Sequence, residues 1–352
     1  MKTIGICFGT STIQVVEIDH SGARKSVSMR RRIVHDGDPA GVLKTFITSC
    51  KVADIDRIAI TGREFRNSVA LTSISEPQAV ESALAAIYGD GGCPDALVSS
   101  GAETQLVYRL TNKCGIGAVY SGNKCASGGG EFFLQQIGRI GVTLEEAGMF
   151  AAQGKPYKIA GRCSVFCKSD CTHAMNKGEP RANIIAGLCR MMADKIADLI
   201  KDKSCRRLAV VGGGSLNTTM VTMLRERFDT VEIPDMADCF EAYGAALWAA
   251  ENECLPLPAD TTTLITLLPQ SFGKHPPLAD ARDLVEFKPS FRGEPHDGDR
   301  CILGLDVGST TTKAVLLRAD DTAILASVYL RTDGDPITAA RKCYTALHEQ
   351  LG

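Results

Sequence analysis

The stretch Ile4–Gln14 reads IGICFGTSTIQ: an apolar run enters a turn of glycine and hydroxyl residues, and a second apolar run follows. This pattern predicts two strands joined by a tight hairpin. Short side chains leave room for backbone N–H groups and hydroxyls to surround a phosphate, and an Asp at the strand end can hold a metal-bound water. The stretch alone favours a phosphate site, and the alternative is a plain turn, because glycine and hydroxyl residues also form ordinary hairpins.

The same pattern recurs near the end of the chain. Leu303–Lys313 reads LGLDVGSTTTK and aligns without gaps on Ile4–Gln14 at an offset of 299 residues. The tetrapeptide DGDP at Asp36–Pro39 recurs at Asp333–Pro336, and in both places it follows a strand-rich stretch and precedes a helical run. Two blocks that repeat in the same order predict a duplicated module.

The second copy stops at Gly352, well short of the length of the first. We therefore predict one complete module at residues 1–252 and the opening fragment of a second at residues 300–352. Residues 253–299 mix Pro, Gly, His and charged residues, and we expect them to connect the two modules.

Three further segments of the first module suit nucleotide binding. Ser99–Thr104 follows an apolar run and precedes another, which predicts a second hairpin. Gly212–Asn217 follows a short strand pattern and precedes a helical run, an arrangement that offers an anion free N–H groups and a helix dipole, although a tight strand-to-helix turn fits as well. Glu241–Ala250 predicts a helix of small residues that could pack against a flat ring or simply against the core.

The order of these segments resembles the nucleotide-binding signatures of the superfamily of actin, heat-shock chaperones and sugar kinases. The fold expected from it is a ribonuclease H-like α/β fold with two lobes and ATP between them. We place lobe I at about residues 1–105 plus 235–252 and lobe II at about 106–234. The predicted nucleotide-binding residues are Gly9, Thr10, Ser11, Thr12, Gly101, Ala102, Gly212, Gly213, Gly214, Asn217 and Gly244, together with Asp306 and Lys313 of the second copy.

The cysteines divide into single and grouped positions. Cys125 lies just before a glycine turn and a predicted helix reaching about Ile140, where a thiolate is favoured. Cys163, Cys167 and Cys171 would lie on one face of a helix, as thiolate ligands for an iron–sulfur cluster or zinc, or with the last two as buried apolar positions. Seven single cysteines fit small buried hydrophobic positions, and we expect reduced thiols in a reducing cell: Cys50, Cys93, Cys189, Cys205, Cys239, Cys254 and Cys343.

At these cysteines the sequence resembles the ATP-dependent activators of 2-hydroxyacyl-CoA dehydratases and the related ATPase subunits of benzoyl-CoA reductases. The segments that carry the resemblance are Asn123–Phe132 (NKCASGGGEF), Cys163–Phe166 (CSVF), Ile74–Glu76 (ISE) and Gly212–Asn217 (GGGSLN). The resemblance implies a homodimer that holds one [4Fe-4S] cluster, with Cys125 and Cys163 of each subunit as ligands. It also implies that ATP hydrolysis drives lobe movement and the transfer of one low-potential electron to a dehydratase-type iron–sulfur enzyme.

The sequence departs from this family at the phosphates. The family's hairpins carry an Asp where this chain has Cys7 and Ser99, and a Lys where it has Gln14, so we expect Mg-ATP hydrolysis by the first module to be weakened or lost. The second copy keeps Asp306 and Lys313, and we expect a complete second module, continuing beyond Gly352, to supply ATP turnover. The expected partner is the dehydratase-type enzyme or further domains of a longer chain. One alternative is a pseudo-ATPase that only binds partners. Another is a small-molecule kinase, for which we see no general-base carboxylate in the cleft.

Composition excludes other classes. Lys and Arg number 39 against 41 Asp and Glu, and a net charge of -2 gives no field that would gather nucleic acid or anionic lipid. No stretch approaches the roughly 18 apolar residues of a membrane span. Because Met1–Asp19 has no basic region ahead of an apolar core and a cleavage site, we do not expect a signal peptide. The expected compartment is the cytoplasm.

Overall fold

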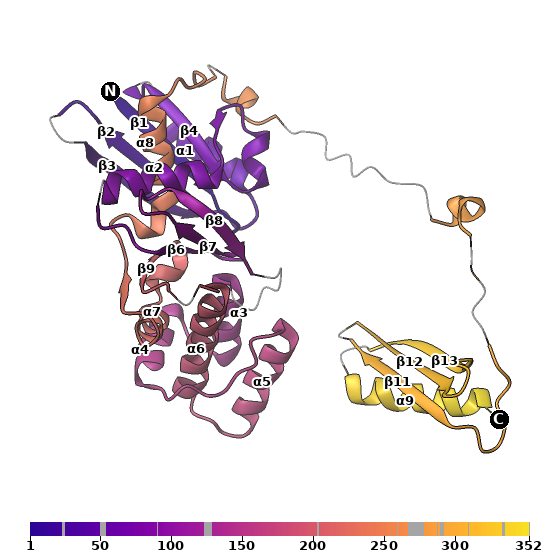
Figure 1. The fold of residues 1–352 in the computed structure, drawn as a ribbon. Coiled ribbons are helices and arrows are strands. Elements are labelled where there is room, and N and C mark those ends of the chain that lie inside the picture. The colour runs from indigo at the N-terminus through magenta and orange to yellow at the C-terminus, as the bar shows by residue number, and fades with distance from the viewer. Residues whose placement is uncertain are drawn as a thin grey trace. The chain divides into compact units, whose positions relative to one another are not determined.

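The computed structural model describes residues 1–22, 25–49, 54–89, 91–122, 129–202, 204–258, 260–266, 278–286, 288, 292–308, 310–332 and 335–351. The chain divides into two units, Met1–Gln270 and Ser271–Gly352 (Figure 1). No helix in the described part of the chain is long and apolar enough to cross a membrane.

The first sheet of unit 1 has the strand order β3-β2-β1-β4-β5. Its β1–β2 and β2–β3 pairs are antiparallel, whereas β4 and β5 add in parallel. One face packs against α1 and the other against α8. The elements are β1 (Lys2–Phe8), β2 (Thr12–Asp19), β3 (Ser26–Val34), β4 (Arg57–Gly62), β5 (Thr72–Ser73), α1 (Pro39–Ser49) and α8 (Phe240–Glu251).

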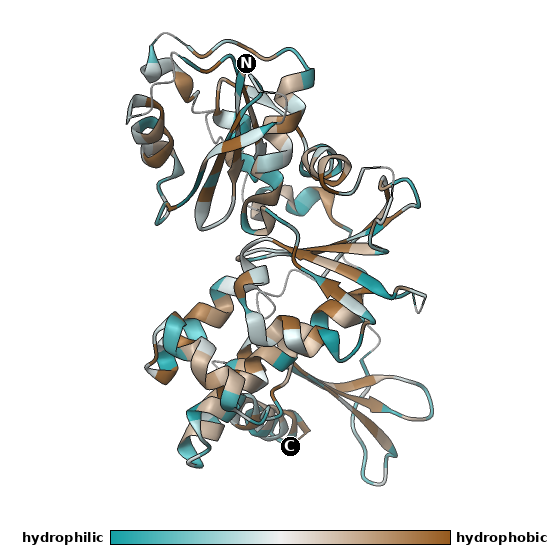
Figure 2. Ribbon diagram, turned by 90° about the vertical axis from the view of Figure 1, so that its left-hand side faces the viewer, coloured by the Kyte–Doolittle hydropathy of each residue, from teal (hydrophilic) through white to brown (hydrophobic). Residues whose placement is uncertain are grey.

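The second sheet of unit 1 has the order β10-β9-β6-β7-β8. We define the first lobe as the first sheet with α1 and α8, and the second lobe as this second sheet with its helices, so the segment 96–105 lies in the second lobe. Helix α2 covers one face, between this sheet and α8, and five helices build a larger core on the other face (Figure 1). Figure 2 shows hydrophobic stretches along strands, and in this sheet β6, β7 and β9 are buried along most of their length. The elements are α2 (Glu76–Tyr88), β6 (Ala96–Ser100), β7 (Gln105–Leu110), β8 (Ile116–Ser121), α3 (Gly130–Ile140), α4 (Leu144–Gln153), α5 (Ser164–Asn176), α6 (Arg181–Leu199), β9 (Arg207–Val211), α7 (Thr218–Arg225) and β10 (Thr230–Glu232).

Helix α8 lies so close to β1 that its contact depends on glycine. A Cβ added at Gly5 would lie 1.9 Å from the carbonyl oxygen of Ala242 and 2.3 Å from the backbone nitrogen of Ala246. On the other side of the helix, a Cβ at Gly244 would lie 1.8 Å from the carbonyl oxygen of Ala79 in α2. The small residues of α8 therefore allow three backbones to pack closely between the two lobes.

Unit 2 repeats the first elements of unit 1. It contains β11 (Cys301–Val307), β12 (Thr311–Arg318), β13 (Ile324–Arg331) and α9 (Pro336–Leu351), with strand order β11-β12-β13. The β11–β12 register reproduces that of β1–β2 residue for residue at the offset of 299, and the N–H of Gly308 donates to the Thr311 carbonyl as that of Gly9 does to Thr12. All residues of β11 are exposed, in contrast to the buried β1.

The single cysteines mostly fill buried positions, as predicted. Cys189, Cys205, Cys239 and Cys343 are buried, and burial raises the pKa of the Cys189 thiol to about 11. The expectation of a free thiol is wrong for Cys93, which forms a disulfide with Cys114 across 21 residues of sequence because the turns before β6 and after β7 are adjacent. Cys254 is half-buried. Cys50 lies outside the described residues.

Candidate functional site

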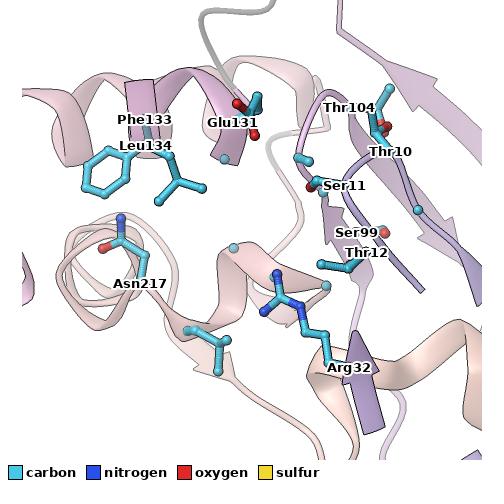
Figure 3. Close-up of a pocket in the computed structure, with 18 of the residues that line it drawn as sticks. Thr10, Ser11, Thr12, Arg32, Ser99, Thr104, Glu131, Phe133, Leu134 and Asn217 are labelled. Carbon is cyan, nitrogen blue, oxygen red and sulfur yellow. The ribbon is translucent and has the colours of Figure 1, made fainter. Parts of the chain in front are cut away.

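A cleft of about 250 Å³ lies between the two lobes of unit 1. The turns after β1 and β6 and the glycine loop after β9 line one part of it, and α3, α4 and α6 line another (Figure 3). Three segments that are distant in sequence therefore present backbone and hydroxyl groups to one cavity.

The first hairpin turn is closed by a hydrogen bond from the N–H of Gly9 to the carbonyl of Thr12, at 2.9 Å. Thr10, Ser11 and Thr12 follow this glycine and line the cleft. The Thr10 hydroxyl also donates to a Glu103 carboxylate oxygen at 3.4 Å, so the turn contacts the opposite lobe.

The second hairpin turn is closed in the same way, by the N–H of Gly101 and the carbonyl of Thr104 at 2.8 Å. The first N–H groups of α3, those of Gly130 and Glu131, donate to the carbonyls of Gly101 and Ala102. The start of α3 is thereby attached to the turn. Arg63, after β4, donates to the Thr104 hydroxyl and adds a further contact between the lobes.

The glycine loop packs tightly on the end of β6. Gly212 has φ +80°, and a Cβ there would lie 2.6 Å from the Ser100 carbonyl oxygen; a Cβ at Gly214 would lie 2.2 Å from the Ser100 Oγ. Asn217 caps α7, since its Oδ1 accepts from the N–H of Met220 at 2.9 Å. Both sequence interpretations of this loop therefore have structural support: it makes a tight turn and it lines the cleft.

The structure brings most of the predicted nucleotide-binding residues into this one cleft. They are Gly9, Thr10, Ser11, Thr12, Gly101, Ala102, Gly212, Gly213, Gly214 and Asn217. Gly244 does not line it and packs against α2 instead. Asp306 and Lys313 lie in unit 2, where they form an ion pair of 3.0 Å.

Three carboxylates in the cleft correct the expectation that it has none. Glu76, Glu131 and Glu241 all line it. Glu241 lies in the first turn of α8, is 9% exposed and accepts a hydrogen bond of 2.7 Å from the hydroxyl of Ser99 near the end of β6. Burial raises the pKa of its carboxyl, and it also contributes to the raised pKa of the buried Cys7 thiol. Sequence spacing could not reveal Glu241, because α8 lies far from both hairpins in the chain.

The cysteine segment is described only in part. Cys125 lies outside the described residues. Cys163 is the half-buried N-cap of α5, whereas Cys167 and Cys171 point into the hydrophobic core of the second lobe. The hydrogen bond with Cys171, together with burial, raises the pKa of the Cys167 thiol. Among the described residues, no group of three or more His, Cys, Asp or Glu side chains could hold a metal ion.

Comparison with known proteins identifies relatives of the first unit. The 2-hydroxyisocaproyl-CoA dehydratase activator of Clostridioides difficile is 26% identical over 159 residues, and this match spans 44% of the chain and 60% of the activator. A benzoyl-CoA reductase component from Thauera aromatica is 26% identical over 269 residues, which are 70% of this chain and 93% of that component.

Two solved structures share the fold. The activator of 2-hydroxyisocaproyl-CoA dehydratase from Clostridium difficile with bound ADPNP gives a TM-score of 0.63 at 22% identity, over 71% of this chain and 95% of that one. Component A of the Acidaminococcus fermentans (R)-2-hydroxyglutaryl-CoA dehydratase gives 0.62 at 21% identity, over 71% and 98%. The predicted two-lobed α/β fold is confirmed. Since the model of the BadF/BadG/BcrA/BcrD ATPase family matches residues 4–249, the chain belongs to that family, as its cysteine and glycine segments predict.

Proposed function

We propose that the cleft of unit 1 binds ATP and that the chain acts as an activator, coupling the nucleotide to the transfer of one electron to a 2-hydroxyacyl-CoA dehydratase-type enzyme. The observation that carries this proposal is the meeting of two hydroxyl-rich turns and a glycine loop at one cleft between lobes. Relatives named as dehydratase activators, one of them crystallised with ADPNP, support it.

In this proposal the two ends of the cleft have different roles. The turns at Gly9–Thr12 and Gly101–Ala102 and the loop Gly212–Gly214 surround the phosphates with N–H and hydroxyl groups. The apolar side chains of Phe133 and Met192 line the other part, which suits a flat base. Thr10 and Arg63 contact the opposite hairpin, so a nucleotide bound here would act on the closure of the lobes.

We further propose that hydrolysis in unit 1 is weakened. Cys7, Gln14 and Ser99 stand where related hairpins carry two Asp and one Lys, and the buried Cys7 thiol, with its raised pKa, does not supply a charge. A hydrated Mg²⁺ and an attacking water would lose their usual anchors. This is also the observation that favours the second candidate, a nucleotide-binding scaffold without turnover.

The proposed iron–sulfur cluster, shared across a homodimer, would be held by Cys125 and Cys163 of each subunit. The described donor fits, because Cys163 is accessible at the N-cap of α5 while Cys167 and Cys171 are buried among apolar side chains. When bound, the cluster would supply one-electron redox chemistry to the chain. Residues Ser164–Asn176 would hold the Cys163 thiolate at a helix start, where the dipole favours it.

Residues 300–352 are proposed to be the opening of a second module. Besides the repeated register, an open groove passes over Gly304 in unit 2, at the position where α8 crosses Gly5 in unit 1. A strand equivalent to β4 and a helix equivalent to α8 would cover the exposed β11.

Anaerobic purification followed by iron and acid-labile sulfide analysis, with calorimetric titration of ATP, tests the proposal. We expect ATP binding and a cluster that is lost in Cys163→Ala but kept in Cys301→Ala, a control at an exposed cysteine of unit 2. ATP binding by a chain that contains no iron would favour the second candidate, the nucleotide-binding scaffold without turnover. Absence of ATP binding would refute both candidates.

A further inference from the structure

Arg32 projects into the cleft from β3, on the edge of the first sheet (Figure 3). Its guanidinium reaches the glycine loop of the other lobe, since a Cβ added at Gly213 would lie 2.8 Å from the Arg32 Nη2. The side chain is exposed. No hydrogen bond or ion pair joins it to any other described residue, whereas Arg30 on the same face of β3 is paired with Asp238.

The register of the sheet relates Arg32 to the lysine that the first hairpin lacks. Gln14 occupies the lysine position, and Arg32 is its direct partner across the β2–β3 ladder. In unit 2 the equivalent cross-strand pair is Lys313 and Tyr329, with the ammonium 5.5 Å from the ring centroid. The two copies therefore carry one cation each at this rung of the sheet, on adjacent strands.

We infer that Arg32 binds the terminal phosphates of the nucleotide, in the role that a lysine at position 14 would otherwise have. A guanidinium offers five donors in a planar fork that suits phosphate oxygens, and in this position it faces the loop whose glycines leave room for an anion. The assignment rests on the proposed function, because it requires that the cleft bind ATP. It adds a phosphate-binding residue that lies outside the hairpin motif.

The test is calorimetric titration of the full chain with ADPNP and, separately, with adenosine. Arg32→Met should weaken ADPNP binding by about tenfold to hundredfold, the value of a charge-assisted contact, and leave adenosine binding unchanged. The matched control is Arg31→Met, because strand alternation places this neighbouring cation on the opposite face of the sheet and outside the cleft. Gln14→Lys added to Arg32→Met should restore much of the ADPNP affinity, and thermal unfolding checks that each variant is folded.

Each result decides a separate point. Loss of ADPNP affinity only in Arg32→Met, with rescue by Gln14→Lys, supports the assignment. Equal ADPNP affinities of Arg32→Met and the unmodified chain would overturn it while leaving the proposed function intact. Equal weakening in Arg31→Met and Arg32→Met would also overturn it, because the effect would then be one of general charge. Failure of the unmodified chain to bind ADPNP would overturn the proposed function itself.

Discussion

The substitution Gly5→Ala should destabilise the first lobe far more than the equivalent substitution, Gly304→Ala, destabilises unit 2. The added methyl would meet backbone atoms of α8 at 1.9 and 2.3 Å, and backbone cannot rotate away as a side chain can. Overpacking costs typically 1–3 kcal/mol, and a backbone clash on this scale belongs at the upper end, about 3 kcal/mol. For a unit of this size that corresponds to a fall of roughly 6–12 °C in Tm.

Gly304→Ala provides the matched comparison, because Gly304 holds the same register position in β11. Its added Cβ would meet only Val315, at 3.2 Å from a methyl and 3.9 Å from the carbonyl oxygen. Since the valine side chain can shift and alanine suits a strand better than glycine, the expected change is within about 0.5 kcal/mol.

Trp248 makes the measurement specific, because it is the one tryptophan of the chain and lies on α8. Its fluorescence during urea unfolding follows the first lobe, while hydrogen exchange in β11 and β12 follows unit 2. An unchanged urea midpoint in Gly5→Ala would refute the packing argument. If hydrogen exchange showed that Gly304→Ala loses as much stability as Gly5→Ala, the groove over Gly304 would have to be already filled.

Three further predictions concern stability. Arg57→Ala removes hydrogen bonds to three carbonyl oxygens at the C-terminal end of α8 and should lower the free energy of unfolding by about 2 kcal/mol, measured in urea. Arg206→Ala, which removes only an exposed ion pair, should change it very little. Equal losses in the two variants would contradict this prediction. Ser75→Ala breaks the capping box of α2 and should cost about 1 kcal/mol, seen as a lower Tm; an unchanged Tm would count against the cap. Burial raises the pKa of Glu241, so between the ordinary Glu pKa and this raised value the folded chain binds more protons than the unfolded chain, and stability falls as pH rises. Glu241→Gln should remove this slope, at most about 1.4 kcal/mol per pH unit, in urea unfolding from acid to neutral pH, and a persistent slope would assign it to another group.

Local patterns in the sequence were sufficient to predict the turns that line the cleft. Both hairpins, the strand before Gly212 and the helix after Asn217 are confirmed, because each depends on glycine placement and alternation within about ten residues. The repeat also predicted that β11 and β12 would pair as β1 and β2 do, since identical turn chemistry sets identical register.

Contacts between segments that are distant in sequence could not be predicted from these patterns. Glu241 was noted only as part of a small-residue helix, yet packing of α8 on β1 brings its carboxylate to Ser99, 142 residues earlier in the chain. Arg32 was missed because its place opposite Gln14 depends on the pairing of β3. Nothing in the spacing of Cys93 and Cys114 distinguished them from the other single cysteines, since only the fold makes them neighbours.

The two copies of the hairpin differ by a pair of charges, which unit 2 carries and unit 1 lacks. In unit 2, Asp306 and Lys313 lie opposite each other with their charged atoms 3.0 Å apart. In unit 1 the same positions are Cys7 and Gln14, and Cys7 is 5% exposed. A carboxylate at this buried position would need a positive partner, because an uncompensated buried charge costs several kcal/mol.

The charges that unit 1 does carry near these positions join different lobes instead of one hairpin. Glu241 extends from α8 in the first lobe to Ser99 in the second, and Arg32 extends from β3 to the loop at Gly213. The Asp306–Lys313 pair, in contrast, forms within a single hairpin and needs no second lobe. Any opening of the cleft would separate Glu241 from Ser99 and Arg32 from the loop, so these contacts depend on the arrangement of the lobes in this structure. A nucleotide that binds Arg32, as proposed, would then favour this arrangement of the lobes by its difference in affinity between this and any other arrangement, which is the physical requirement for any nucleotide-driven movement.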